Sequence, residues 1–151
     1  AELVDRHKRW VVALAYQLLA DVEEAEDIAQ DAFVIAYERL RSLRRHNSFR
    51  CWLRRVVLHL AFRRRRNRRR ALKIDVDLAD IGVDSAHQTR IMVHDILCAM
   101  PDHLAVVLVL RELHALSYRE IAQTLRVPVG TVRSRLHAAR EYFRRLWQGG
   151  E

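Results

Sequence analysis

The sequence predicts an all-α protein of two small helical domains, a three-helix bundle and a helix-turn-helix, joined by an acidic linker. The 151 residues include only four glycines and two prolines, which argues against a turn-rich β fold. Apolar residues recur at spacings of three and four along most of the chain, as in amphipathic helices. The main interruption, residues 71–90, alternates aspartates with aliphatic residues and fits no helical stripe, so an extended linker is expected there.

The first block, residues 1–70, is expected to begin with two helices. The first covers residues 2–19 and carries an apolar face formed by Trp10, Val11, Leu14 and Leu18. The second follows Asp21, which can cap it with Glu24 as its capping-box partner, and runs to about Leu43. Its core-facing stripe consists of Ala25, Ile28, Ala29, Ala32, Ala36 and Leu40.

A third helix is expected to start at Asn47 or Ser48 and to lose its regular pattern in the arginine run of residues 63–70. Its core stripe consists of Phe49, Trp52, Leu53, Val56 and Leu60. A second apolar line lies opposite, formed by Cys51, Leu58 and Phe62. This line either docks on a partner or packs against the other block of the same chain, and the sequence favours neither.

The second block, residues 91–151, is expected to open with a helix over residues 91–99 that ends at Pro101. Another helix runs from there to about Leu113. The segment from Leu104 to Leu110 is entirely apolar and is therefore expected to be buried, in the chain itself or against a partner.

The end of the second block has the pattern of a helix-turn-helix. Ser117 and Glu120 can form a capping box ahead of a short helix, residues 126–130 make a tight connection, and a long basic helix covers residues 129–147. The expected inward stripe of this last helix is Val129, Val132, Leu136, Ala139 and Phe143.

With that stripe inward, one face of the last helix suits the major groove of DNA. The side chains expected to point outward are Ser134, His137, Ala138, Glu141 and Arg145. Thr131, Arg133 and Arg135 flank them, and the amides of Gly130 and Thr131 can hold a phosphate. An amphipathic helix that binds nothing would show the same stripe, but the capped helix and tight turn before it favour DNA binding.

The charge of the chain is divided between opposite signs. The formal net charge is +8 and the pI is about 10.4, which indicates a polyanionic partner. Residues 21–31 hold six acids and no base, whereas residues 39–70 hold fourteen arginines and no acid. One surface should therefore repel DNA while another attracts it.

Enzymatic and membrane functions find little support. The candidate metal cluster is His94, Cys98 and His103, but a complete ligand set is not evident. No nucleophile–base motif or glycine-rich phosphate loop occurs, so no catalysis, no cofactor and no small-molecule substrate are expected. Cys51 and Cys98 lack CxxC spacing and are interpreted as free thiols of a cytoplasmic protein. The apolar runs are too short to insert into a membrane.

Two stretches of the first block, AEDIAQDAFVIAYERL at residues 25–40 and SFRCWLRRVVLHLAFRRRR at residues 48–66, resemble region 2 of an extracytoplasmic-function (ECF) sigma factor of the sigma-70 family. LSYREIAQTLRVPVGTVRSRLHAAR at residues 116–140 resembles region 4 of the same family. LuxR-type regulators share part of the latter pattern. The resemblance therefore depends on both halves occurring in the expected order, and it covers about residues 10–147.

The resemblance implies a bacterial RNA polymerase sigma factor, with region 2 at residues 1–70, a linker at 71–90 and region 4 at 91–151. Its implied partners are the polymerase core (the β′ clamp coiled coil and the β flap), promoter DNA and an anti-sigma factor. The residues implied for core polymerase binding are Asp27, Gln30, Asp31 and Phe33. Those implied for recognising and melting the −10 element are His46, Asn47, Ser48, Trp52, Arg54, Arg55, His59, Arg63, Arg64, Arg65 and Arg66. Those implied for the −35 element are Gly130, Thr131, Arg133, Ser134, Arg135, His137 and Ala138. The alternative is a helix-turn-helix regulator that binds DNA without polymerase, which would leave the acidic stretch unexplained.

Overall fold

The computed structural model describes residues 2–40, 49–72 and 85–149, and the regular structure in these ranges is entirely helical. The elements in chain order are α1 (Glu2–Leu19), α2 (Val22–Arg39), α3 (Phe49–Leu72), α4 (Ser85–Ala99), α5 (Asp102–Leu108), the π-helical turn η3 (Val109–Leu113), α6 (Tyr118–Leu125) and α7 (Val129–Gly149). The all-α prediction is confirmed. Three predictions lie outside the described residues: the end of the second helix near Leu43, the start of the third helix at Asn47 or Ser48, and most of the linker.

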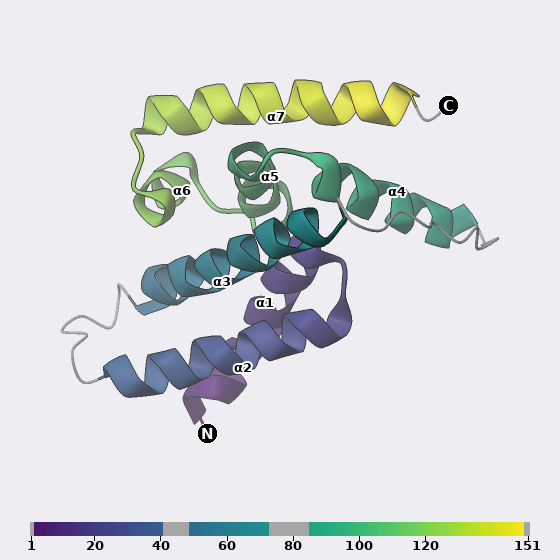
Figure 1. The fold of residues 1–151 in the computed structure, drawn as a ribbon. Coiled ribbons are helices and arrows are strands. Elements are labelled where there is room, and N and C mark those ends of the chain that lie inside the picture. Colours follow the sequence, from purple (N-terminus) through teal and green to yellow (C-terminus); the bar gives the residue numbers. More distant parts are fainter. Residues whose placement is uncertain (1, 41–48, 73–84, 150–151) are drawn as a thin grey trace.

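The two helical blocks pack against each other. In Figure 1, α7 runs along one side of the molecule, α4, α5 and α6 lie beneath it, and α3 lies between these helices and α2. Helix α3 contacts α6, and α1 contacts both α4 and η3, so the seam between the blocks involves several elements. The buried apolar residues of both blocks accordingly form one continuous cluster.

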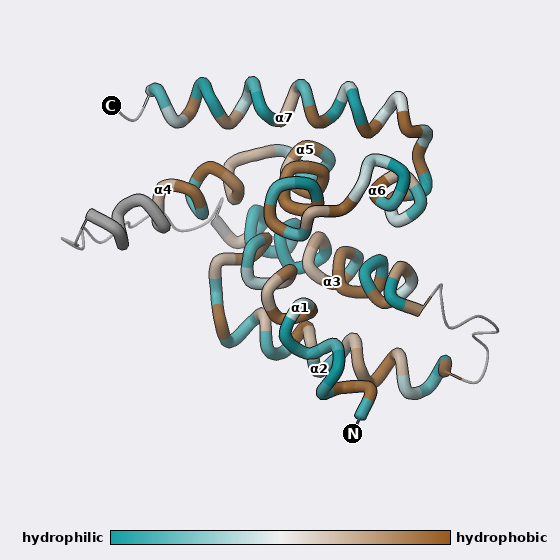
Figure 2. Tube along the Cα trace, turned by 180° about the vertical axis from the view of Figure 1, so that it is seen from behind, coloured by the Kyte–Doolittle hydropathy of each residue, from teal (hydrophilic) through white to brown (hydrophobic). Residues whose placement is uncertain are grey.

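The apolar stripes predicted for the first two helices face this core. Val11, Leu14 and Leu18 of α1 are fully buried, and so are the alanines and Ile28 of α2. Figure 2 shows hydrophobic and hydrophilic residues alternating along α2 and α7, whereas α5, in the middle of the molecule, is mostly hydrophobic. Two predicted stripe positions are wrong: Leu40 is 42% exposed and Val129 is 38% exposed. Both occupy an end of their helix, where the core no longer covers the stripe.

Helix α3 differs from the prediction in its length. It continues through the arginine run to Leu72, whereas the sequence suggested that its pattern would be lost over residues 63–70. Arginine is a good helix former, so the run does not end the helix. The helix is also buried on more than one side, since Leu53, Val57 and Ala61 are joined in the core by Leu58.

The second apolar line of α3 meets the other block of the chain, which resolves the alternative left open by the sequence. Leu58 is buried, and the Cys51 thiol lies 3.6 Å from the Thr124 hydroxyl of α6. Helix α4 likewise begins earlier than predicted, at Ser85 rather than near Ile91.

The caps explain where several helices begin. Ser117 and Glu120 form the complete predicted capping box, with bonds of 3.1 and 3.0 Å between each side chain and the other residue's amide. Asp21 caps α2 by accepting a 2.9 Å bond from the Glu24 amide. The Glu24 carboxylate, however, pairs with Arg68 of α3, so this acid ties α2 to α3 rather than completing a capping box.

Left-handed residues mark three helix ends. Ala20 follows α1, Ala115 follows η3, and Arg126 ends α6 inside the helix-turn-helix, with φ angles of 55°, 55° and 57°. The segment Leu104–Leu110 is buried throughout, as predicted, and other helices of the same chain cover it.

Candidate nucleic-acid and protein interfaces

One side of α3 presents a stripe suited to a nucleic-acid strand. At 100° per residue, positions 52, 59, 63 and 66 fall within one narrow sector of the helix. Trp52 is half-buried at one end of this stripe, and His59, Arg63 and Arg66 are exposed along it. An aromatic ring followed by cationic groups can stack a base and neutralise phosphates. The three loop residues predicted to act beside Trp52 (His46, Asn47 and Ser48) lie outside the described residues.

Other arginines predicted to contact DNA lie elsewhere in this arrangement. The guanidinium of Arg54 lies 5.5 Å from the centre of the Trp10 ring, and this side chain is only 6% exposed. Arg55 donates to the carbonyls of Gln123 and Thr124 at the end of α6, at 2.6 and 3.0 Å. Both arginines are therefore engaged within the protein, while Arg64 is half-buried.

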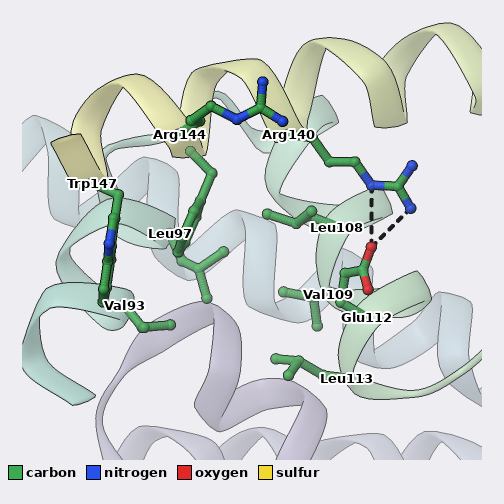
Figure 3. A pocket seen from close by; sticks show the side chains of 10 residues that line it. Val93, Leu97, Leu108, Val109, Glu112, Leu113, Arg140, Arg144 and Trp147 are labelled. Carbon is green, nitrogen blue, oxygen red and sulfur yellow. Dashed lines mark hydrogen bonds and ion pairs between the residues drawn. The ribbon is translucent and has the colours of Figure 1, made fainter. Parts of the chain in front are cut away.

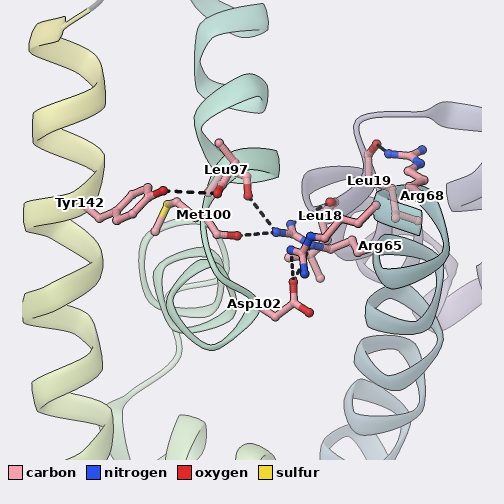
Figure 4. A network of polar contacts seen from close by, with 10 residues as sticks. Leu18, Leu19, Arg65, Arg68, Leu97, Met100, Asp102 and Tyr142 are labelled. Carbon is pink, nitrogen blue, oxygen red and sulfur yellow. Dashed lines mark hydrogen bonds and ion pairs between the residues drawn. The ribbon is translucent and has the colours of Figure 1, made fainter. Parts of the chain in front are cut away.

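Arg65 forms the centre of a polar network that joins the blocks (Figure 4). Its guanidinium donates to the backbone carbonyls of Leu18, Leu97 and Met100 at 3.1, 3.1 and 2.8 Å. It also pairs with the Asp102 carboxylate at 2.9 Å, and only 3% of the residue is exposed. Burial lowers the pKa of Arg65 from its ordinary value, and the nearby Asp102 charge acts in the opposite direction. Arginine nevertheless stays protonated in proteins, so the network contains a buried cation.

Neighbouring arginines extend this network. Arg69 makes a second ion pair with Asp102 at 2.7 Å, and Arg68 pairs with Glu24 and donates to the Leu19 carbonyl. The end of the arginine run thus serves two purposes: some of its side chains are exposed and others hold helices together. The sequence gives no direct sign of this division, because the run has no interspersed acids.

The exposed face of α2 differs in charge from the exposed stripe of α3, because it carries carboxylates where that stripe carries arginines. Asp27, Gln30 and Asp31 are exposed, whereas Phe33 is half-buried and packs against the core. Tyr37 on the same helix is 83% exposed. A face that combines carboxylates with an uncovered aromatic ring is better suited to a basic protein surface than to DNA.

The outward face of α7 carries most of the predicted major-groove residues. Gly130, Arg133, Ser134, His137 and Ala138 are exposed, and Thr131 and Arg135 are half-buried beside them. One prediction needs correction: the amide of Thr131 already donates to the Pro128 carbonyl at 3.0 Å, so it is not available to a phosphate.

Sequence reasoning missed an apolar pocket between α4, α5–η3 and α7 (Figure 3). Its volume is about 520 Å³, and its walls include Val93, Leu97, Phe143 and Trp147. Glu112 and Arg140 form a 2.8 Å ion pair at the pocket, which raises the pKa of Arg140. The pattern of the sequence could not reveal this pocket, because apolar residues lining a pocket have the same spacing as those filling a core.

The candidate metal residues do not form a ligand set. Among the described residues, no three His, Cys, Asp or Glu side chains are grouped so that they could hold a metal ion. The His94 ring packs edge-on against Tyr16 of α1, with ring centres 4.9 Å apart, and Cys98 is exposed. Over the part of the chain that the structure describes, none of the helices has the length and apolar character needed to cross a membrane.

Comparison with known proteins finds sigma factors, both among protein-family models and among individual relatives. Residues 3–71 match the family model for sigma-70 region 2, and residues 90–142 match that for sigma-70 region 4. The chain is 32% identical to the ECF RNA polymerase sigma factor SigW of Bacillus subtilis, over 96% of this chain and 87% of that protein. It is 33% identical to the RNA polymerase sigma-H factor of Pseudomonas aeruginosa, over 92% of this chain and 81% of that protein.

Two solved structures share the fold. One is the sigma factor RpoE in complex with the anti-sigma factor NepR from Bartonella quintana, with a TM-score of 0.73, 18% identity and coverage of 97% of this chain and 95% of that chain. The other is CnrH in complex with the cytosolic domain of CnrY, with a TM-score of 0.76, 23% identity and coverage of 99% and 88%.

Proposed function

The chain belongs to the ECF sigma factors of the sigma-70 family and directs RNA polymerase to specific promoters, and we propose that it does so through three separate surfaces. The observation that supports this proposal is the separation of charge described above: exposed acids on α2, and exposed arginines on α3 and α7. In this proposal residues 1–70 act as region 2, residues 71–90 as a linker and residues 91–151 as region 4. Sigma factors are initiation factors rather than catalysts, and we propose no cofactor or catalytic step for this chain.

The α2 face is the proposed docking surface for the β′ clamp coiled coil of polymerase. Asp27, Gln30 and Asp31 would contact it directly, since all three are exposed. Phe33 would contribute through its exposed edge while the rest of its ring stays in the core. Carboxylates at this interface select a basic partner and at the same time keep promoter DNA off this side of the molecule.

The exposed stripe of α3 is the proposed −10 surface. Trp52 and the loop residues His46, Asn47 and Ser48 would hold unpaired bases, while His59, Arg63 and Arg66 follow the strand. Unpairing costs a few kcal/mol, and base stacking together with phosphate neutralisation offsets this cost. Arg54, Arg55, Arg64 and Arg65 belong to the same proposal, but the contacts of Arg54, Arg55 and Arg65 within the protein would first have to break.

The α7 face is the proposed −35 surface. Arg133, Ser134, His137 and Ala138 would lie against base edges in the major groove, with Thr131 and Arg135 beside the DNA backbone and Gly130 at the helix start. Polymerase holds this surface and the −10 surface together, so that neither needs to bind tightly by itself. The β flap is the proposed polymerase contact of region 4.

An anti-sigma factor is the proposed occupant of the apolar pocket beside α7. One structural neighbour, RpoE, is a sigma factor in complex with an anti-sigma factor, and the other, CnrH, is in complex with the cytosolic domain of CnrY. An apolar side chain of such a partner would fill the space between Leu97, Phe143 and Trp147. Because polymerase and its template occupy the bacterial cytoplasm, we propose that the chain acts there.

Run-off transcription with core polymerase on a promoter library tests the proposal. The chain should yield transcripts only with core polymerase, from templates that share two elements. The double variant Asp27→Asn, Asp31→Asn should load onto core polymerase about tenfold less well, since it loses two interface charges. The matched control, Glu2→Gln with Asp5→Asn, removes two exposed charges from α1 and should load normally. Tight sequence-specific binding by the chain without core polymerase would instead support the regulator alternative.

A further inference from the structure

The apolar pocket beside α7 has the dimensions of a small-molecule site. Its volume of about 520 Å³ lies within the range of about 300–1,000 Å³ that is typical of such sites in proteins. Its floor belongs to the core of the molecule, because Leu97, Leu108 and Val109 are all buried. Side chains that are close-packed in a core shift little, so the pocket is preformed and a ligand does not have to open it.

The walls of the pocket suit a ligand with an apolar body. The rings of Phe143 and Trp147 on α7 lie nearly parallel, with their planes 15° apart and their centres 6.1 Å apart, and both side chains are half-buried. Val93 of α4 lies beside Trp147 at the same end of the pocket (Figure 3). Water between such walls finds few hydrogen-bond partners, whereas a hydrocarbon chain contacts them on every side.

The charged groups of the pocket lie away from this apolar end. Arg140 donates two bonds to the Glu112 carboxylate, at 3.2 and 2.8 Å, and the two charges cancel. Arg144 lies between that pair and Trp147 (Figure 3). Its Nη1 donates to Glu141 at 2.8 Å in a pair that is largely accessible to solvent. Because exposed pairs contribute little free energy, the Arg144 guanidinium can take a second carboxylate at small cost.

We propose that this pocket binds an amphipathic monocarboxylate, a fatty acid of medium chain length, with its carboxylate on Arg144 and its alkyl chain along Phe143 and Trp147. Two N–H donors of a guanidinium match the two oxygens of a carboxylate, so this contact fixes the head group at the rim. The Glu112 carboxylate repels a second negative charge at its own end of the pocket, which favours one orientation of the ligand. The ligand is an effector, and none of its bonds is made or broken.

The fatty acid would share its site with a second proposed occupant. An anti-sigma side chain is proposed to fill the space between Leu97, Phe143 and Trp147, and the pocket cannot hold both. The fatty acid would therefore compete with that partner, a consequence that rests on the proposed function. Binding of the fatty acid by the free chain does not rest on it.

Isothermal titration calorimetry of the full chain with sodium decanoate tests the site. One decanoate should bind per chain, saturably and with a Kd below about 1 mM, as expected for a ligand of this size. Val93→Phe places a ring in the apolar end of the pocket and should weaken binding at least about tenfold. The matched control is Met92→Phe, at the neighbouring position of α4, which lines a different pocket and should leave binding unchanged. Absence of saturable binding, or equal binding by the two variants, would overturn the proposal.

Arg144→Met tests the contact with the head group, because methionine keeps part of the apolar stem and removes the charge. It should weaken decanoate binding about tenfold, as expected for the loss of a hydrogen bond to a charged group. Binding of decanol, which has the same chain without the carboxylate, should not change. The matched control is Arg145→Met, at an exposed position outside the pocket, which should affect neither ligand.

Two results of this comparison would contradict the proposal. If Arg145→Met weakens decanoate binding as much as Arg144→Met does, the net positive charge of the chain attracts the anion and no particular site is involved. If Arg144→Met binds decanoate as tightly as the unsubstituted chain, the carboxylate does not lie on this guanidinium.

Run-off transcription with core polymerase separates failure of this inference from failure of the proposed function. The calorimetric measurements use the free chain and need neither polymerase nor promoter. Transcription by a chain that does not bind decanoate would refute the ligand site and leave the sigma-factor surfaces standing. Saturable decanoate binding by a chain that does not support transcription would support the ligand site and contradict the proposed function.

Discussion

Replacing Arg65 with methionine should strongly destabilise the packing of the two blocks against each other. Methionine keeps much of the apolar stem but removes every donor, leaving the carbonyls of Leu18, Leu97 and Met100 without the guanidinium. Loss of one partner of a buried charged pair costs about 3–5 kcal/mol. Asp102 retains Arg69 at 2.7 Å, which places the expected loss in free energy of unfolding near the lower value, about 3 kcal/mol.

Urea unfolding followed by far-ultraviolet circular dichroism measures this loss. With an m-value of about 2 kcal/mol per molar urea, the midpoint should fall by about 1.5 M. The matched control is Arg66→Met, one position along the same helix, where the side chain is exposed and the expected change is within about 0.5 kcal/mol. If the two variants unfold within about 1 kcal/mol of each other, the Arg65 network does not stabilise the fold and the reasoning about the seam fails with it.

Further perturbations test other features of the fold. Burial, followed by the charges of Arg54 and Arg50, lowers the pKa of His114, so the unfolded chain takes up a proton there before the folded chain does. The free energy of unfolding should therefore fall as pH decreases below about 6.5, and His114→Gln should reduce this slope in urea titrations at several pH values. Ala20→Gly should raise stability by about 1 kcal/mol in thermal unfolding, because Ala20 has φ 55° and glycine adopts that conformation without steric cost; a loss of stability would contradict this account. Ser117→Ala should lower stability by about 1 kcal/mol by removing the cap of α6, and a change below a few tenths would show that the cap contributes little.

Much of the fold could be predicted from the sequence because its signals are local. Capping residues such as Ser117 and the three-and-four spacing in α1 and α2 depend only on neighbours along the helix, and the structure confirms them. The exposed ends of the stripes, at Leu40 and Val129, escaped prediction because burial there depends on which elements lie opposite. Helix periodicity does not indicate which elements lie opposite a given helix end.

The sequence alone could not distinguish the arginines that form the candidate DNA-binding surface from those that are buried in the fold. Arg63, Arg65 and Arg66 are chemically identical and lie within four consecutive positions, yet Arg65 is buried and the other two are exposed. Their roles differ because the acceptors of Arg65 come from α1, α4 and α5, which lie far along the chain. The pocket beside α7 escaped notice for the same reason, since its walls come from three separated helices.

The buried guanidinium also bears on how mutational surveys of this chain would be interpreted. In a scan scored by reporter expression, losing Arg65 and losing Arg66 would both silence the reporter, yet one defect would arise from abundance or folding and the other from template engagement. Second-site suppressors would separate them: compensating changes for Arg65 should cluster around Asp102 on the opposite block, whereas loss of Arg66 should be relieved by a new basic side chain elsewhere on the exposed stripe of α3.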